Sequence, residues 1–249
     1  MAAFLFGILL AFTIARTRER LALVQDLVAT GNAILHTIHQ SVAVFGDDEA
    51  LRVRDLIDRH LISQIDYQLV DYHRATASHL ELMEEVYALV PRNRQQESVY
   101  RVLVDLCARL EVDRALIEAA TGQELSSLEW SGLFLLLFLL LGLIAVLPGG
   151  TVLGALVSGV TAGTLVTLMI LLRKLDLLRW HERVSIWEPT ARLFRSMGRD
   201  PYVPRDVIRS GRFQPRGSVR VVDYPDPYPN RSTKIVATEV IDDTNGAIF

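Results

Sequence analysis

Two long apolar runs, separated by a Pro-Gly-Gly turn, constrain this chain more than any other feature. The first extends from Trp130 to Leu147 and the second from Thr151 to Leu172, and neither contains Asp, Glu, Lys or Arg. Because an α-helix rises about 1.5 Å per residue, about 20 apolar residues cross a hydrocarbon core that is roughly 30 Å thick. The sequence therefore predicts a transmembrane hairpin over residues 130–172.

A third apolar run lies at the amino terminus. Residues 2–15 are apolar or neutral, and Arg16, Arg18 and Arg20 follow them. A secretory signal peptide carries positive charge before its apolar run, whereas here the charge comes after it. We therefore expect a membrane anchor over residues 1–16, with a cleaved signal peptide as the alternative.

Basic residues also follow the last span, whereas the Pro-Gly-Gly turn carries no charge. Because lysine and arginine are enriched in cytoplasmic flanks, this pattern predicts three crossings with the amino terminus outside and the carboxy terminus in the cytoplasm. Tryptophan rings favour the membrane interface. The residues expected to contact lipid headgroups there are Trp130, Arg173, Lys174, Arg179, Trp180 and Arg183.

The region between the anchor and the hairpin, residues 17–129, has apolar residues at helical spacing and predicts a cytoplasmic helical bundle. Its first helix continues from the anchor and ends at Gly46, and Asp47 or Asp48 is expected to cap the next. The second helix is expected to break near His60. It ends before Pro91, which cannot continue a helix.

The third bundle helix is expected to end at Gly122, a residue type that is favoured after the last helical turn. Ser126 or Ser127 then begins the helix that enters the membrane at Trp130. No internal repeat and no Gly/Ser-rich linker interrupts this region, which argues against a solenoid.

The last region, residues 173–249, begins with an amphipathic helix and becomes rich in proline and arginine. A further short helix is expected to end at Gly198. Residues 219–224 and 234–241 have the composition of strands around a proline-rich turn, which predicts a small β-hairpin. The chain is thus expected to be mainly α-helical, with a small β-containing tail.

Small residues form two neighbouring rows on the last span, and such rows allow helices to approach closely in lipid. The candidate packing residues are Gly154, Ala155, Ser158, Gly159, Ala162 and Gly163. These rows fit either packing against the first hairpin helix or self-association. A pore-lining face is a further alternative, and its hydroxyl residues are Ser158, Thr161, Thr164 and Thr167.

Charge is distributed unevenly around the hairpin. Residues 16–129 hold 12 arginines against 19 acidic residues, and residues 173–249 hold 14 basic against 10 acidic residues. The basic tail is expected either to pair with the acidic bundle or to contact anionic lipid headgroups. The net charge of −3 gives no support for nucleic-acid binding.

No pattern in the sequence specifies a reaction. It contains no phosphate-binding glycine loop, kinase motif set or nucleophile elbow, so we expect a protein that is not an enzyme and has no cofactor. His36 and His39 share one helix face and are weak candidates for metal ligands, but no His-Glu-x-x-His pattern accompanies them. The single cysteine, Cys107, excludes an internal disulfide framework.

The carboxy-terminal half resembles uncharacterised bacterial multi-pass membrane proteins. The residues that carry this resemblance are Leu128, Glu129, Trp130, Leu175, Asp176, Trp180, Glu182, Pro189, Phe194, Gly198, Pro201, Tyr202 and Pro204. The layout of cytoplasmic helices around membrane hairpins is loosely similar to bestrophin-type anion channels. Those channels have an even number of crossings and an aromatic pore neck, whereas only Phe134 and Phe138 are aromatic inside the first hairpin span.

These features predict an integral membrane protein of the bacterial inner membrane, with three transmembrane helices and a cytoplasmic bundle. Its expected partners are the lipid bilayer and further copies of itself, and a cytoplasmic protein is also allowed. The first functional hypothesis is a structural or interaction protein whose bundle and basic tail bind a partner or lipid headgroups. The second is an oligomeric ion channel lined by a hairpin helix, and a membrane-bound enzyme is the third.

Overall fold

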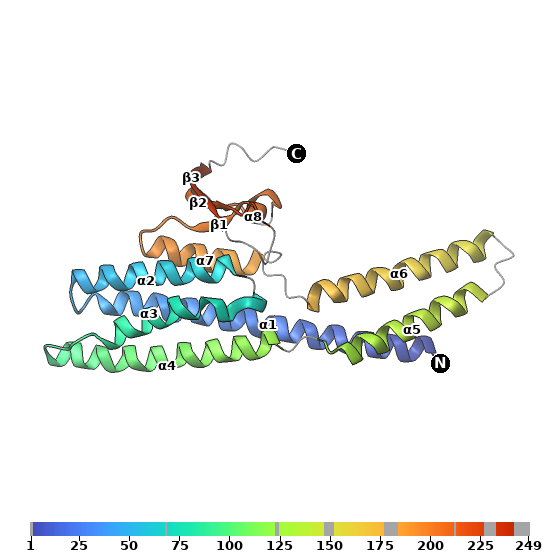
Figure 1. Ribbon diagram of the computed structural model, residues 1–249, viewed down its shortest axis with the longest axis horizontal. Coiled ribbons are helices and arrows are strands. Elements are labelled where there is room, and N and C mark those ends of the chain that lie inside the picture. The colour runs from blue at the N-terminus through green and yellow to red at the C-terminus, as the bar shows by residue number, and fades with distance from the viewer. Residues whose placement is uncertain are drawn as a thin grey trace. The chain divides into compact units, whose positions relative to one another are not determined.

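A computed structural model describes residues 2–67, 69–122, 125–146, 152–176, 184–211, 213–226 and 233–241. Helices dominate, and one small sheet lies near the carboxy terminus (Figure 1). The helices are α1 (Ala2–Val42), α2 (Asp47–Asp66), the 3-10 helix η1 (Leu69–Ala75), α3 (Thr76–Tyr87), α4 (Arg94–Gly122), α5 (Ser127–Val146), α6 (Val152–Asp176), α7 (Val184–Ser196) and α8 (Arg205–Arg209). The mainly helical fold class is confirmed.

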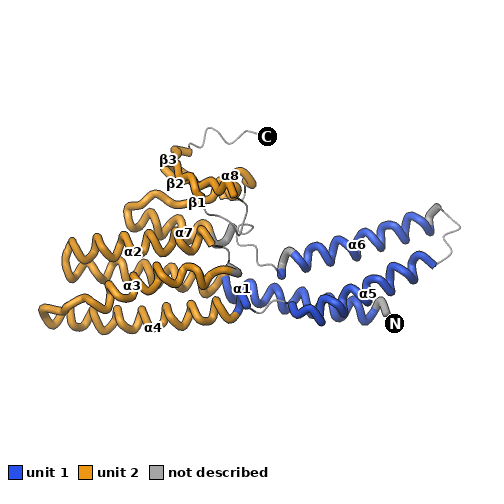
Figure 2. Tube along the Cα trace, in the orientation of Figure 1, with its two compact units in different colours: residues 1–24, 120–178 blue, residues 25–119, 179–249 orange. Residues whose placement is uncertain are grey.

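The chain divides into two compact units (Figure 2). Unit 1 comprises residues 1–24 and 120–178, and unit 2 comprises residues 25–119 and 179–249. Helix α1 contributes residues to both units, because it continues without a break from Ala2 to Val42. The prediction that the bundle's first helix continues directly from the amino-terminal apolar run is therefore confirmed.

Unit 1 is held together by apolar packing among α1, α5 and α6. The side chains of Phe6 and Leu10 are buried against Leu133 and Leu137 of α5 and against Leu172 of α6. The buried residues of α5 lie four and then three positions apart, which places them on one helix face. The remaining faces of α5 and α6 are largely exposed in the chain.

Three helical stretches are long and apolar enough to cross a membrane, and they lie within Phe4–Val42, Arg94–Val146 and Gly154–Arg173. This finding rests on length and composition. The Pro-Gly-Gly turn lies outside the described residues, as do Arg179, Trp180 and Arg183 and most of the predicted amphipathic helix, which begins at Leu175.

A capping box begins α5 at the predicted position. The backbone N–H of Glu129 donates to Ser126 Oγ at 3.2 Å, and the backbone N–H of Ser126 donates to Glu129 Oε2 at 2.8 Å. This reciprocal pair satisfies two backbone donors that the first helical turn leaves without partners. The spacing Ser-x-x-Glu therefore fixes where the first hairpin helix starts.

In unit 2, the turn between α1 and α2 corrects one prediction. Neither Asp47 nor Asp48 caps α2; both lie in its first turn, and Gly46 occupies the capping position without a side-chain hydrogen bond. Gly46 has φ of +142°, a conformation that residues with a Cβ rarely adopt. The two aspartates instead place negative charge at the positive end of the helix dipole.

The expected break near His60 is also wrong, because α2 continues through that residue to Asp66. The chain then forms η1 and starts again as α3 at Thr76. His60 lies well inside α2 and is almost fully buried, with 1% of its surface exposed. The histidine is therefore a packed core residue rather than a helix breaker.

The sheet has three strands in the order β1-β2-β3: β1 (Tyr202–Pro204), β2 (Gly217–Asp223) and β3 (Ile235–Ile241). The predicted antiparallel pairing of β2 with β3 is confirmed over seven residues, from Gly217 opposite Ile241 to Asp223 opposite Ile235. The sequence did not predict β1, which adds to β2 in parallel. The predicted helix before the sheet is α7, which ends two residues before Gly198.

Candidate functional site

Helix α6 carries most of the residues that the sequence analysis singled out, and only one of its faces is covered within the chain. Met169 and Leu172 are buried, and Gly154, Ser158 and Ala162 are half-buried. Because a helix advances about 100° per residue, these positions lie on one side. The row Gly154, Ser158 and Ala162 thus lies at the edge of the face that packs against its own chain.

The second small-residue row is open. Ala155, Gly159 and Gly163 are all exposed. A Cβ added to Gly159 or Gly163 would meet no other atom within 4 Å. The close approach that small residues permit is therefore not used inside this chain, and the row is available to another helix.

The four candidate hydroxyl residues do not form a single face. Consecutive members are three positions apart, so each is rotated by about 300° from the one before it and the set winds around the helix. Ser158 is half-buried beside the packed face, whereas Thr164 and Thr167 are exposed and lie away from that face. Only the threonines can therefore line a common open surface.

Each described threonine of this set is bonded to its own helix. The hydroxyls of Thr161, Thr164 and Thr167 donate to the carbonyl oxygens four residues earlier, each at 2.8 Å. This bond satisfies the polar hydrogen where no water is present. The hydroxyl oxygens retain lone pairs that point away from the helix axis as acceptors.

A buried ion pair closes the end of unit 1 where α6 finishes. The guanidinium of Arg20 donates to Asp176 Oδ1 at 3.4 Å and to the Asp176 backbone oxygen at 2.7 Å, and both side chains are less than a tenth exposed. The same carboxylate accepts from the backbone N–H of Leu125 at 3.1 Å and from Trp130 Nε1 at 3.3 Å. One aspartate therefore joins α1, the start of α5 and the end of α6.

Sequence analysis missed this cluster. Arg20 and Asp176 are far apart in the sequence, and each looks like an ordinary flanking charge. Trp130, which was expected at the lipid interface, uses its indole N–H for Asp176 and stacks on Phe134 with ring centroids 5.6 Å apart. The only local signal for this cluster was Trp130, which follows the acidic residue Glu129 at the start of α5.

The two candidate metal ligands have other environments. His36 Nδ1 lies 3.0 Å from Ser196 Oγ of α7, and His39 is half-buried with its Nδ1 enclosed. Among the described residues, no group of three or more His, Cys, Asp or Glu side chains is arranged to hold a metal ion.

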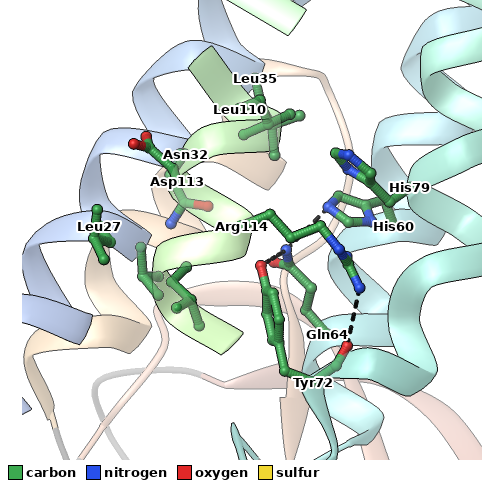
Figure 3. Close-up of a pocket in the computed structure, with 13 residues that line it drawn as sticks. Leu27, Asn32, Leu35, His60, Gln64, Tyr72, His79, Leu110, Asp113 and Arg114 are labelled. Carbon is green, nitrogen blue, oxygen red and sulfur yellow. Dashed lines mark hydrogen bonds between the residues drawn. The ribbon is translucent and has the colours of Figure 1, made fainter. Parts of the chain in front are cut away.

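A small cavity with both polar and apolar lining residues lies inside the bundle of unit 2 (Figure 3). Its volume of about 20 Å³ matches one water-sized molecule. On one side, Gln64 Nε2 donates to Tyr72 Oη at 2.8 Å and lies 2.9 Å from His60 Nε2. The guanidinium of Arg114 donates to the backbone oxygen of Tyr72 at 3.3 Å (Figure 3).

The histidines of this cavity are held in the neutral form. The rings of His60 and His79 lie 5.3 Å apart, and both are at most 2% exposed. Burial, with the positive charges of its neighbours, lowers the pKa of His60 to about 3. Burial also lowers the pKa of His79, although Glu111 Oε1 at 3.0 Å from its Nε2 partly opposes this shift.

Several arginines of the tail pair with acidic groups of unit 2 itself. Arg220 donates to both carboxylate oxygens of Asp58, at 2.9 Å and 2.6 Å, and Arg199 pairs with Asp55. Arg205 pairs within the tail, with Asp223 at 2.5 Å and Glu239 at 2.6 Å. Pairing with the acidic bundle, one of the two alternatives for the basic tail, therefore accounts for Arg199 and Arg220, whereas Arg205 pairs inside the tail.

Asp66, the last residue of α2, is the centre of the tail's attachment. Its carboxylate accepts from Tyr202 Oη at 2.8 Å, from Tyr224 Oη at 2.7 Å and from Lys234 Nζ at 2.6 Å. Burial and the nearby carboxylate raise the pKa of both tyrosines, so both hydroxyls stay protonated as donors. The sheet is thereby fastened to the end of α2.

Comparison with known proteins gives one family. A model described as the Bestrophin-like domain matches residues 1–177. This match ends one residue after Asp176 and includes all three apolar stretches. Comparisons with curated proteins and with solved structures gave no match.

Proposed function

The chain belongs to the Bestrophin-like domain family, and on that premise we propose that several copies assemble in a membrane as an ion channel. The resemblance in layout to bestrophin-type anion channels agrees with this family. The proposal places the channel ahead of the structural or interaction protein that the sequence alone favoured. The main support for this proposal is that the family match includes all three apolar stretches. In a single chain, most side chains of α5 and α6 are also exposed and therefore available to contact lipid or another copy.

Among the described residues of unit 1, the interior is a packed apolar cluster of side chains that α1, α5 and α6 bury against one another. A pathway must therefore run between copies, as in any channel whose lumen lies on a symmetry axis. This requirement supports the proposed oligomer.

The three faces of α6 suggest how copies meet. The packed face contacts its own chain, and the open row of Ala155, Gly159 and Gly163 is proposed to contact a neighbouring copy. Thr164 and Thr167, about a third of a turn further round, are proposed to face the lumen. In this arrangement the small residues bring neighbouring helices close together and the hydroxyls line the pathway.

The orientation is part of the same proposal. Positive charge after the first and last spans supports an amino terminus outside and a bundle and tail in the cytoplasm of a bacterial cell. Native Cys107 is fully buried and is a poor reporter. We expect Val90→Cys, at a position with 73% exposure, to react with membrane-impermeant thiol reagents only after the cells are opened.

The test of function is ion flux through liposomes that contain the purified full chain, with chloride and potassium as the two probe ions. The particle mass is measured on the same preparation. We expect flux from a defined oligomer and its loss in Thr164→Trp, because an indole obstructs the lumen. Leu139→Trp, at a residue of α5 with 51% exposure, is the matched control and should conduct.

Assembly is tested separately from conduction. Gly159→Leu should reduce the oligomer to smaller species, because the added side chain occupies the contact between copies. Gly142→Leu is the matched control, since a Cβ at Gly142 likewise meets nothing within 4 Å in its own chain. Liposomes that stay sealed to both ions with correctly inserted oligomer would return the structural or interaction hypothesis to first place.

A further inference from the structure

Strand β3 is an edge strand whose inner side is fully used and whose outer side is open. It pairs with β2 along all seven of its residues. In the part of the chain that the structure describes, no strand pairs with its outer edge. Such an edge presents a row of backbone N–H and C=O groups that can extend the sheet into another chain.

The side chains of β3 are unusual for a strand that ends a sheet in water. Ile235, Val236 and Val240 are 60%, 47% and 71% exposed, whereas Val219, Val221 and Val222 of β2 are buried. β-Branched apolar residues favour strands because they pack against cross-strand neighbours. Among the described residues, the side chains of β3 have cross-strand neighbours only on the side that faces β2.

Charged side chains commonly protect an edge strand from pairing with another strand, but those in and next to β3 form ion pairs within their own chain. Lys234, next to the strand, contacts Asp66 at 2.6 Å, and Glu239 contacts Arg205 at 2.6 Å. Edge strands avoid pairing by presenting lysines or inward-pointing charges to an approaching strand. Because both charges are engaged within their own chain, this edge is left apolar.

The sequence of β3 is self-complementary. In an antiparallel pair centred on Thr238, Val236 lies opposite Val240, Ile235 lies opposite Ile241 and the small Ala237 lies opposite Glu239. Residues that face each other across such a pair point to the same side of the sheet and contact each other. Centring the pair on Ala237 instead would set Ile235 opposite Glu239 and Lys234 opposite Val240.

We propose that β3 is an interface with a second copy of this chain, formed by antiparallel β3–β3 pairing about a twofold axis at Thr238. The pairing joins two three-stranded sheets into one continuous sheet of twice that size. The interface lies in the tail, beyond residues 1–177 that match the family, and it does not rest on the proposed channel. A twofold contact is closed, so it links copies in pairs and the full assembly contains an even number of chains.

The register gives a sharp test by single-cysteine crosslinking of the full chain in detergent. At the twofold axis residue 238 faces itself, with the two Cα atoms about 4.5–5.5 Å apart, within disulfide range. Thr238→Cys should therefore form a disulfide-linked dimer on mild oxidation. The native Cys107 is buried and should not interfere.

Val240→Cys on the same strand is the matched control. Two copies of residue 240 are separated by four residues along the strand, or about 14 Å, which a disulfide cannot span. This variant should stay uncrosslinked alone and should crosslink when mixed with Val236→Cys. Equal crosslinking of Thr238→Cys and Val240→Cys would indicate random collision and overturn the proposal.

Charge substitutions test the pairing without oxidation. Val236→Lys with Val240→Lys sets like charges opposite each other and should abolish the Thr238→Cys dimer. Val236→Lys with Val240→Glu sets opposite charges together and should restore it. All these positions are exposed, so the fold of the tail should tolerate them.

Failure of this interface and failure of the channel are distinguishable. Lack of a Thr238→Cys dimer in a folded, oxidised preparation would overturn β3 pairing, whatever the liposomes conduct. Conversely, a Thr238→Cys dimer in protein whose liposomes stay sealed would support the interface and count only against the channel.

Discussion

The two units of this chain are held together by different interactions. Unit 1 relies on apolar contacts among α1, α5 and α6 and adds one deeply buried ion pair, Arg20 with Asp176. Unit 2 joins distant segments through many polar contacts, such as Asp58 with Arg220 and Asp66 with Tyr202. In the proposed channel unit 1 lies in lipid, where polar contacts at the outer surface gain little, and unit 2 lies in water, where they can select one docking arrangement.

The largest loss of stability is expected at the buried ion pair of unit 1, Arg20 with Asp176. Asp176→Ala leaves Arg20 buried without its carboxylate and removes the acceptor for Leu125 N–H and Trp130 Nε1. Removing one partner of a buried pair costs about 3–5 kcal/mol. Denaturant unfolding in detergent, followed by Trp130 fluorescence in a background with Trp180→Phe and Trp187→Phe, measures this loss.

The control for that prediction is the exposed ion pair of the same unit. Arg16 and Glu129 lie 2.7 Å apart with 51% and 38% of their side chains exposed. Glu129→Gln keeps an oxygen for the cap and should cost less than about 1 kcal/mol. Equal losses from both variants would mean that burial does not distinguish the two pairs.

Next in size is the attachment of the sheet in unit 2. Asp66→Ala removes a charged acceptor that three donors share, and a buried hydrogen bond to a charged group is worth about 1.5–3 kcal/mol. We expect amide hydrogens of β2 and β3 to exchange at least tenfold faster, measured by mass spectrometry. Asp55→Ala, at a half-exposed pair with Arg199, should change exchange far less.

A smaller and graded loss of stability is expected as pH falls, and it should affect unit 2 and not unit 1. The folded-state pKa values of His60 and His79 lie below the ordinary value, so the unfolded chain binds more protons once pH falls below about 6.5. The stability of unit 2 should therefore be full above about pH 6.5. It should decline by about 1 kcal/mol per pH unit through His60 as pH falls toward the folded-state pKa of about 3, and His79 contributes in the same direction.

Unit 1 contains no histidine, which makes it the internal control. Trp187 is buried in unit 2 and reports its unfolding, while Trp130 reports unit 1. Between pH 7 and pH 5 the Trp187 transition should shift to lower denaturant, and His60→Gln with His79→Gln should flatten that dependence. A parallel shift of both transitions would assign the effect to other groups.

The smallest effect is expected at the threonines of α6. Thr167→Val removes an exposed hydroxyl that donates to the Gly163 carbonyl of its own helix. The stability of unit 1 should change by less than about 0.5 kcal/mol in the same denaturant assay, as expected for a surface change away from the core. A loss comparable to that of Asp176→Ala would show that this hydroxyl has a partner in another copy.

The parts of the fold that follow local rules were predictable from the sequence. Hydropathy located the three apolar stretches, and Ser126 or Ser127 was expected to begin the helix that is α5, where Ser126 caps it. Strand-like composition on both sides of a proline-rich turn located β2 and β3. These signals act over a few residues, so a single sequence contains them.

The misses depend on distant partners or on weak local signals. The change from α2 to η1 contains no proline or glycine between Asp66 and Thr76, so nothing in the sequence marked it. Strand β1 is only three residues long and exists because β2 lies beside it. The Arg20–Asp176 pair and the docking of Arg220 on Asp58 join residues that only the folded chain brings together.

The back-bonded threonines of α6 carry a consequence for the sign of the permeating charge. Each described hydroxyl has given its hydrogen to a backbone carbonyl, so it offers a passing ion only oxygen lone pairs. Solvating an anion would require breaking that bond at a cost of about 0.5–1.5 kcal/mol per hydroxyl, whereas a cation is solvated without any rearrangement. In the proposed channel this wall favours cations, and the reversal potential in a potassium chloride gradient would reveal the preference.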